Sequence, residues 1–174
     1  MDAKALPTMP SDRADAIVYR PVGVVHSPLN EPYGAPIQSI AARDVEGTVE
    51  IFPQYAEGLR DIEGFSHLIL IYHFHLAKEP SLIVKPYLDD VGHGVFATRA
   101  PARPNPIGTS VVRLVRVDGA RLHVTGLDIL DGTPILDIKP YVSQFDAIET
   151  QKIGWLKERI HMVEDTKDDG RFRK

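Results

Sequence analysis

Hydrophobic and polar residues alternate along much of the chain from about residue 16 onward, and this period of two predicts strands rather than helices. The segment Phe65–His75, FSHLILIYHFH, has the strongest strand pattern. Two further strands flank the pair Asp118-Gly119, which is typical of a hairpin turn. We also predict extended segments at Ile17–Ser27, Gly47–Phe52 and Thr133–Val142.

Helical patterns are confined to a short segment around Gln54–Asp61 and to Ile153–Ile160, IGWLKERI. Strands and helices do not alternate along the chain, so the pattern favours a mainly β protein: a compact single β-barrel with short helices and a C-terminal helix. We expect residues 1–15 to form a disordered lead, residues 16–145 to form the barrel domain, and residues 146–174 to hold the C-terminal helix and a charged, frayed tail.

Composition narrows the possible chemistry. The 174-residue chain has no cysteine, which excludes disulfides, thiolate metal sites and cysteine nucleophiles. Its formal net charge of −4 provides no overall attraction for nucleic acid, although a local basic patch is compatible with it. No apolar run approaches the roughly 20 residues that span a membrane, and no apolar leader opens the chain, so we expect no membrane partner.

The segment Arg99–Ser110, RAPARPNPIGTS, interrupts the strands with three prolines, which are compatible with neither a helix interior nor a central strand. Arg99 and Arg103 are four residues apart and point the same way if the segment is extended. Guanidinium groups on a stiff loop suit a carboxylate or a phosphate, and Asn105 can donate and accept beside them. The alternative is a surface loop with solvated arginines.

The histidines predict a pocket residue rather than a metal site. His73 and His75 resemble an HxH metal pair on one face of their strand, but no further ligand stands at a fixed spacing, so we expect no metal. His75, at the strand end, is positioned to line a pocket.

Three aspartates, Asp128, Asp131 and Asp137, lie in LDILDGTPILDIKPYV. Asp131-Gly132 is most simply a turn, and the other two can be solvated strand residues. The alternatives are a carboxylate that binds ligand hydroxyl or ammonium groups, or a pair facing each other across a glycosidase cleft. Neither a nucleophile elbow nor a phosphate loop is present in the sequence.

Four strings together closely resemble the TsaA-like, or TrmO-like, family. They are EPYGAPIQ, GLRDIEGFSHLILIYHFH, FATRAPARPNPIGTSVVRL and LDILDGTPILDIKPYV, and the resemblance extends over about Ile17–Ser143. The resemblance implies a β-barrel methyltransferase outside the Rossmann class, with S-adenosylmethionine as cofactor. It further implies N6 methylation of threonylcarbamoyladenosine at position 37 of tRNA, a homodimer and a cytoplasmic location.

The resemblance also implies a set of cofactor-binding residues, two of which differ from the usual family choice. Thr109 stands where leucine is usual, and Ile37 stands where many members have a basic residue. The full set is Pro36, Ile37, Gln38, His75, Leu76, Arg99, Thr109, Ile129, Leu130, Asp131 and Gly132.

The substrate side has fewer candidates. Arg103 is expected to hold the carboxylate of the threonylcarbamoyl group, with Asn105 beside it. The nitrogen that is methylated must lose a proton, and His75 and Asp131 are candidates to accept it. Two alternatives stay open: the same barrel methylating another nucleoside or a small molecule, and a non-catalytic module that binds S-adenosylmethionine and regulates a partner.

Overall fold

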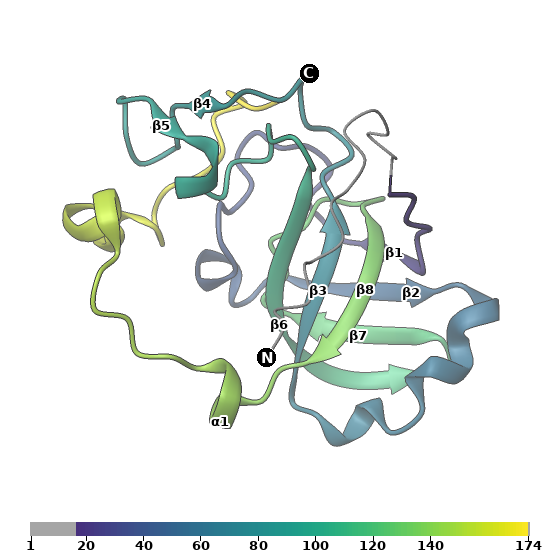
Figure 1. Ribbon diagram of the computed structural model, residues 1–174. Coiled ribbons are helices and arrows are strands. Elements are labelled where there is room, and N and C mark those ends of the chain that lie inside the picture. The colour runs from purple at the N-terminus through teal and green to yellow at the C-terminus, as the bar shows by residue number, and fades with distance from the viewer. Residues whose placement is uncertain (1–16, 174) are drawn as a thin grey trace, which may run out of the picture.

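A closed barrel of six antiparallel strands forms the centre of the computed structural model, which describes residues 17–173 (Figure 1). The strands follow one another around the barrel in the order β1-β2-β7-β6-β3-β8. This confirms the prediction of a mainly β single barrel, while the lead expected over residues 1–15 lies outside the described residues. The strand bounds are β1 Gly23–His26, β2 Glu46–Ile51, β3 His67–His73, β6 Ile107–Asp118, β7 Arg121–Thr125 and β8 Pro134–Pro140.

Strand β3 runs between β6 and β8 and supplies the middle of the core. Its side chains alternate as predicted: Leu68, Leu70 and Tyr72 are buried, whereas His67 and His73 lie on the outer face. Each fully buried leucine stabilises the fold by about 1.5–3 kcal/mol relative to leaving it in water. Buried residues of the other five strands fill the rest of the barrel.

Two strand predictions were right in kind but shifted in position. The β6–β7 hairpin turns at Gly119–Ala120, with Gly119 at a φ of +58° that favours glycine. The first strand begins at Gly23 rather than at Ile17. Ile17, Val18 and Tyr19 are exposed and lie outside any strand, because β-propensity alone does not provide a partner.

The segments outside the barrel are short. Their bounds are β4 Ile83–Val84 and β5 His93–Gly94, which pair with each other, the α-helix α1 Ser143–Asp146, and the 3-10 helices Ser39–Ala42, Pro53–Leu59, Ile62–Gly64, Val95–Ala97, Gly154–Glu158 and Ile160–Met162. The helix predicted at Ile153–Ile160 is therefore two 3-10 turns, and Gly154, at a φ of +58°, precludes a regular helix through its first residues. In the described part of the chain, no helix has the length and apolarity needed to cross a membrane.

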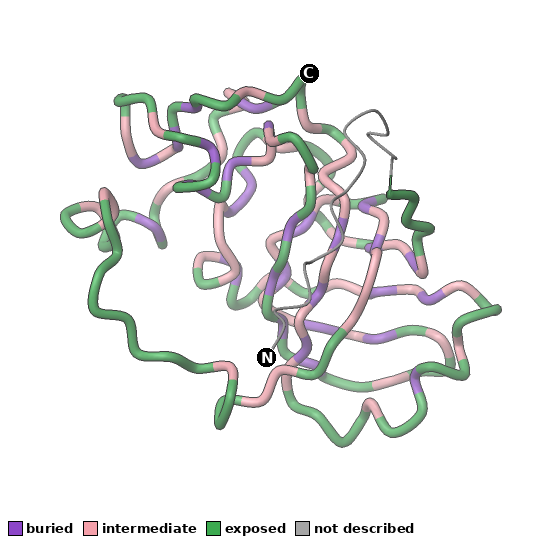
Figure 2. Tube along the Cα trace, viewed as in Figure 1, coloured by how far each residue is buried: buried purple, intermediate pink, exposed green. Residues whose placement is uncertain are grey.

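The C-terminal tail is not frayed, contrary to expectation. After α1 the chain runs exposed along one side of the molecule, and its last described residues lie beside β4 (Figures 1 and 2). Val163 and Phe172 are 7% and 5% exposed. Phe172 packs with Val84, Val95, Ala100 and Ala102 in a second small core. The charged composition of these last residues did not predict this contact, because Phe172 is the one aromatic residue among them.

Candidate functional site

A pocket lies at the end of the barrel where β3 finishes and β6 begins. It brings together most of the residues predicted to bind the cofactor, although they come from five separate segments. Those that line it are Pro36, Ile37, Gln38, His75, Leu76, Arg99, Thr109, Ile129 and Leu130. Asp131 and Gly132 are not among the lining residues. Of the two substrate candidates, Arg103 lines the pocket and Asn105 does not; Asn105 is exposed.

The start of β6 explains the glycine of the PNPIG string. Gly108 pairs with Tyr72 across the β3–β6 ladder, and the Tyr72 ring occupies the space that a side chain at Gly108 would fill. Phe74, just beyond β3, donates its backbone N–H to the carbonyl of Pro106 at 2.7 Å, which ties the proline loop to the strand end. The pocket floor is therefore aromatic side chains packed directly against backbone.

The proline loop, residues 99–106, packs against the rest of the protein and is not a solvated surface loop. Ala100 and Ala102 are buried. The Arg103 guanidinium donates to the carbonyls of Val95 and Thr98 at 3.2 and 3.3 Å, so it ties the loop to the 3-10 turn that precedes it. Arg103 thus reaches the pocket with part of its donor capacity already used.

Arg99 differs from Arg103 in what it contacts. Its guanidinium donates to the side-chain oxygen of Gln38 at 2.8 Å and links the proline loop to the segment that carries Pro36 and Ile37. Because a guanidinium has five N–H donors, the single bond to Gln38 leaves capacity for a ligand. Of the two loop arginines, Arg99 is the better placed to pair with a ligand carboxylate.

Asp128 is a pocket residue that sequence reasoning had treated as a candidate solvated strand residue. It stands between the buried Leu127 and Ile129, and its carboxylate accepts a 2.6 Å hydrogen bond from the Ser110 hydroxyl. Burial raises the pKa of Asp128 to about 6, and the Ser110 hydrogen bond and the nearby Arg99 charge only partly oppose this. Its alternation between two core residues was the signal, but alternation alone did not show what it faces.

The two residues proposed as proton acceptors occupy different environments. His75 lines the pocket and lies 3.3 Å from the Thr133 hydroxyl, and burial, followed by the neighbouring His73, lowers its pKa. Asp131 accepts the backbone N–H of Ser27 at 3.0 Å and fastens its turn to the end of β1. The geometry gives Asp131 the role of a turn residue.

The C-terminal strap, defined as Lys167–Arg173, closes one side of the pocket. Its two ends form β-bridges with Pro36 and Ala77, which stand on different pocket walls. Asp168 donates its backbone N–H to the Ala35 carbonyl at 2.9 Å. The strap thereby joins two segments that are about forty residues apart in sequence, and Asp168 and Phe172 line the pocket from it.

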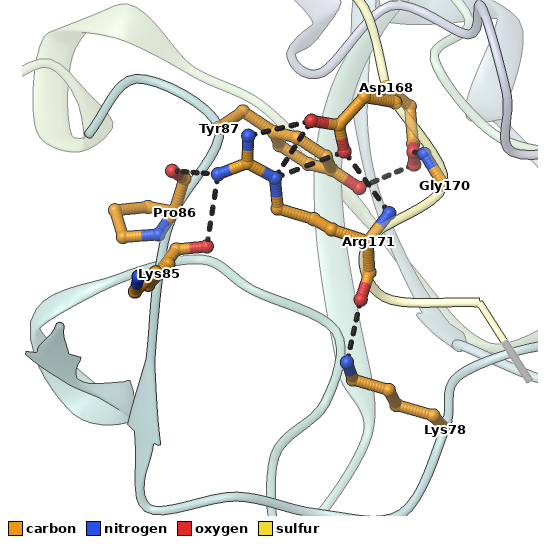
Figure 3. Close-up of polar contacts among 8 residues, drawn as sticks. Lys78, Lys85, Pro86, Tyr87, Asp168, Gly170 and Arg171 are labelled. Atoms are coloured by element: carbon orange, nitrogen blue, oxygen red, sulfur yellow. Dashed lines mark hydrogen bonds and ion pairs between the residues drawn. The ribbon is translucent and has the colours of Figure 1, made fainter. Parts of the chain in front are cut away.

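Side chains hold the strap in place (Figure 3). The Tyr87 hydroxyl donates a short hydrogen bond to the Asp168 carboxylate, and burial followed by this contact raises the pKa of Tyr87. Arg171 pairs with Asp169 and donates to the carbonyl of Pro86 at 2.7 Å. No sequence motif predicts this network of hydrogen bonds, because its partners come from distant parts of the chain.

The pocket therefore combines aromatic and apolar walls with a few charged groups, an arrangement typical of small-molecule sites. The charged side chains on its wall include Arg99, Asp128 and Asp168. Across residues 17–173, no cluster of three or more histidine and acidic side chains is arranged to hold a metal. The carboxylates and the guanidinium suit a ligand that carries charges of both signs.

Comparison with known proteins relates this chain to methyltransferases. Residues 24–147 match the profile of the tRNA-methyltransferase O N-terminal domain. The chain is 62% identical over 156 residues to a probable S-adenosyl-L-methionine-binding protein of Pyrococcus abyssi, a match that covers 90% of this chain and 85% of the relative. It is 32% identical over 145 residues to the tRNA (adenine(37)-N6)-methyltransferase of Mus musculus, covering 79% of this chain and 34% of the mouse protein.

Solved structures agree with this relationship. The crystal structure of TrmO from Pseudomonas aeruginosa superposes with a TM-score of 0.67 at 39% identity and covers 80% of this chain. A further TrmO crystal structure gives a TM-score of 0.69 at 41% identity, again over 80% of this chain. The chain spans 62% and 64% of the lengths of these two proteins.

Proposed function

The chain belongs to the tRNA-methyltransferase O N-terminal domain family, and from this premise we propose that it transfers a methyl group from S-adenosylmethionine to an adenosine N6 atom of tRNA. The substrate we assign is threonylcarbamoyladenosine at position 37. The observation that carries the proposal is the pocket, because nine of the residues that the family resemblance assigns to the cofactor, Arg99 among them, line it together with Asp128.

The lining residues fit the chemical groups of S-adenosylmethionine. Arg99 has donors available for the carboxylate of the cofactor. Phe74 and Phe172 offer aromatic surface for the adenine. When bound, S-adenosylmethionine supplies an electrophilic methyl group, so covalent catalysis by the protein is unnecessary.

The chain's own residues contribute by positioning and by excluding water. The strap and the proline loop hold the pocket walls together, and a fixed geometry for two reacting groups supplies much of a bimolecular rate. Arg103 is our candidate for the substrate carboxylate, with the part of its guanidinium that the carbonyls of Val95 and Thr98 do not use.

Binding and activity can be tested separately. Calorimetry should give a micromolar dissociation constant for S-adenosylmethionine, and no heat at millimolar ligand would contradict the cofactor assignment. Methyl transfer should then be measured on threonine tRNA with and without the threonylcarbamoyl group, with nucleosides identified by mass spectrometry. Equal methylation of both tRNAs, or of free nucleoside, would contradict the substrate assignment.

The assembly and location of the protein complete the proposal. We assign it a homodimer that works in the cytoplasm, where mature tRNA is available. Light scattering at micromolar concentration should give twice the monomer mass of 19.3 kDa, and a monomer mass would contradict the dimer.

A further inference from the structure

Asp128 has one carboxylate oxygen held by the protein and one that remains available. Ser110 donates to Oδ1 at 2.6 Å, and apart from the backbone N–H of Asp128 itself no other donor in the described part of the chain reaches the carboxylate. Since Leu127 and Ile129 on either side point into the barrel core, the Asp128 side chain is directed to the pocket wall by the backbone.

The hydrogen bonds behind Asp128 have a defined direction. A serine hydroxyl has one hydrogen, and Ser110 uses it toward Asp128, so Tyr72 must donate its own hydroxyl hydrogen to Ser110 across 3.1 Å. The result is an ordered chain of donors that ends on the carboxylate. Such a chain fixes the carboxylate's orientation and favours its ionised form.

The groups around Asp128 come from several elements. Tyr72 belongs to β3 and Arg99 to the proline loop, and His75, beyond the end of β3, lines the same pocket. Burial raises the pKa of Asp128 to about 6 despite Arg99, so the carboxylate is ionised at neutral pH yet binds a proton more tightly than a solvated aspartate. The pocket's other carboxylate, Asp168, already accepts from Tyr87 and from the backbone N–H of Gly170.

We propose that Asp128 accepts the proton that the substrate nitrogen loses during methyl transfer, while Ser110 and Tyr72 hold its carboxylate in position. This role rests on the proposed function. The nitrogen lone pair forms the new N–CH₃ bond, the S–CH₃ bond breaks with its electrons on sulfur, and the N–H proton passes to Asp128 while that bond's electrons stay on nitrogen. The products are the thioether, the methylated base and a neutral Asp128.

Charge favours Asp128 over His75 for this role. The reaction begins with a sulfonium cation, and a carboxylate stabilises positive charge as it moves from sulfur to nitrogen. If the neutral imidazole of His75 accepted the proton instead, it would become a cation. Burial and the neighbouring His73 already disfavour that charge, because both lower the pKa of His75. Asp131, which fastens the turn to Ser27, is outside the set of lining residues.

The test uses the full-length protein with Asp128→Asn, which keeps the size of the side chain and the acceptor for Ser110. S-adenosylmethionine affinity by calorimetry should change less than about threefold, while the single-turnover rate on tRNA should fall by about 100- to 10,000-fold. The wild-type rate should rise as the pH passes through about 6, and the residual rate of the variant should lack this dependence. Asp118→Asn, in the exposed β6–β7 hairpin, should behave as wild type.

Ser110→Ala tests whether Asp128 takes part in the reaction, because a purely structural role for Asp128 would leave the midpoint of the pH–rate profile unchanged. Because the Ser110 hydrogen bond lowers the pKa of Asp128, its removal should shift the midpoint of the pH–rate profile upward. The carboxyl-carbon NMR signal of Asp128 in the ligand-free protein should titrate near pH 6 and shift in the same direction. A titration midpoint near 4 would overturn the proposal.

The outcomes separate this role from the function on which it rests. No methyl transfer by the wild type would overturn the proposed function and the role of Asp128 together. Wild-type transfer with an equally active Asp128→Asn variant would overturn the role of Asp128 alone. A loss of S-adenosylmethionine affinity that accounts for the whole loss of rate would also overturn it, because Asp128 would then be a cofactor-binding residue.

Discussion

Asp128→Asn should make the folded protein more stable at neutral pH, because the wild-type protein holds an ionised carboxylate in a partly buried place. Burial raises its pKa from the usual 3.8 to about 6. A rise of this size corresponds to about 3 kcal/mol of unfavourable free energy in the ionised folded state. Asparagine has no charge to bury and retains an oxygen that can accept from Ser110.

The sign follows from proton binding. Between about pH 4 and pH 6 the folded protein binds the Asp128 proton more tightly than the unfolded chain, so this group's contribution to the free energy of unfolding falls as the pH rises. Below that window the variant and the wild type should have similar stability. Above it the variant should be more stable, by up to about 3 kcal/mol.

Urea denaturation at half-unit steps from pH 3.5 to pH 8 measures this difference directly. The matched control is Asp118→Asn, because Asp118 is 72% exposed and asparagine before glycine also suits a hairpin turn. A stability difference for Asp128→Asn that does not change with pH, or a variant less stable than wild type at pH 8, would refute the reasoning. A confirmed result would mean that the pocket retains this carboxylate at a cost in stability.

Three further predictions concern the pocket walls. Gly108→Ala should push the Tyr72 ring from its place and lower the free energy of unfolding by about 1–3 kcal/mol, measured by urea denaturation. Tyr87→Phe removes the donor to Asp168 and should cost about 1.5–3 kcal/mol, most of which a double-mutant cycle with Asp168→Asn should assign to the pair. Arg99→Ala should weaken S-adenosylmethionine binding by about 10- to 100-fold in calorimetry.

Each of these predictions has a control and a contradicting outcome. Gly94→Ala meets no atom within 4 Å and should leave stability nearly unchanged; an equal loss at both glycines would show that the Tyr72 contact is irrelevant. A coupling energy near zero would mean that Tyr87 and Asp168 do not hold the strap together. Arg113→Ala, on the outer face of β6, should leave S-adenosylmethionine binding intact. Unchanged affinity in Arg99→Ala would remove that residue from the site.

The two loop arginines illustrate how far the site could be predicted from the sequence. Their spacing on a stiff loop predicted that both guanidinium groups point the same way, and in the structure both Arg99 and Arg103 line the pocket. Their different contacts could not be predicted, since Arg103 donates to carbonyls of Val95 and Thr98 and Arg99 donates to Gln38. Those partners depend on how the loops fold against each other.

The strap illustrates the opposite case. A run of charged residues predicts a solvated tail, and most of the side chains in it are indeed polar. Phe172 and Asp168 nevertheless line the pocket, because Tyr87 and the backbone near Ala35 provide partners far away in sequence. No local pattern encodes such contacts.

The sequence by itself determined that the chain forms a barrel and roughly where its strands end. Alternation with a period of two decides which side chains can enter a core, and prolines and glycines decide where strands must stop, so both are local properties. Only the tertiary structure decided that Asp128 is hydrogen-bonded to Ser110, that Ser110 is hydrogen-bonded to Tyr72, and that Asp128 lines the same pocket as Arg99. A carboxylate's proton affinity depends on the water it loses and the charges it gains, and both are set by residues that meet only in the folded chain.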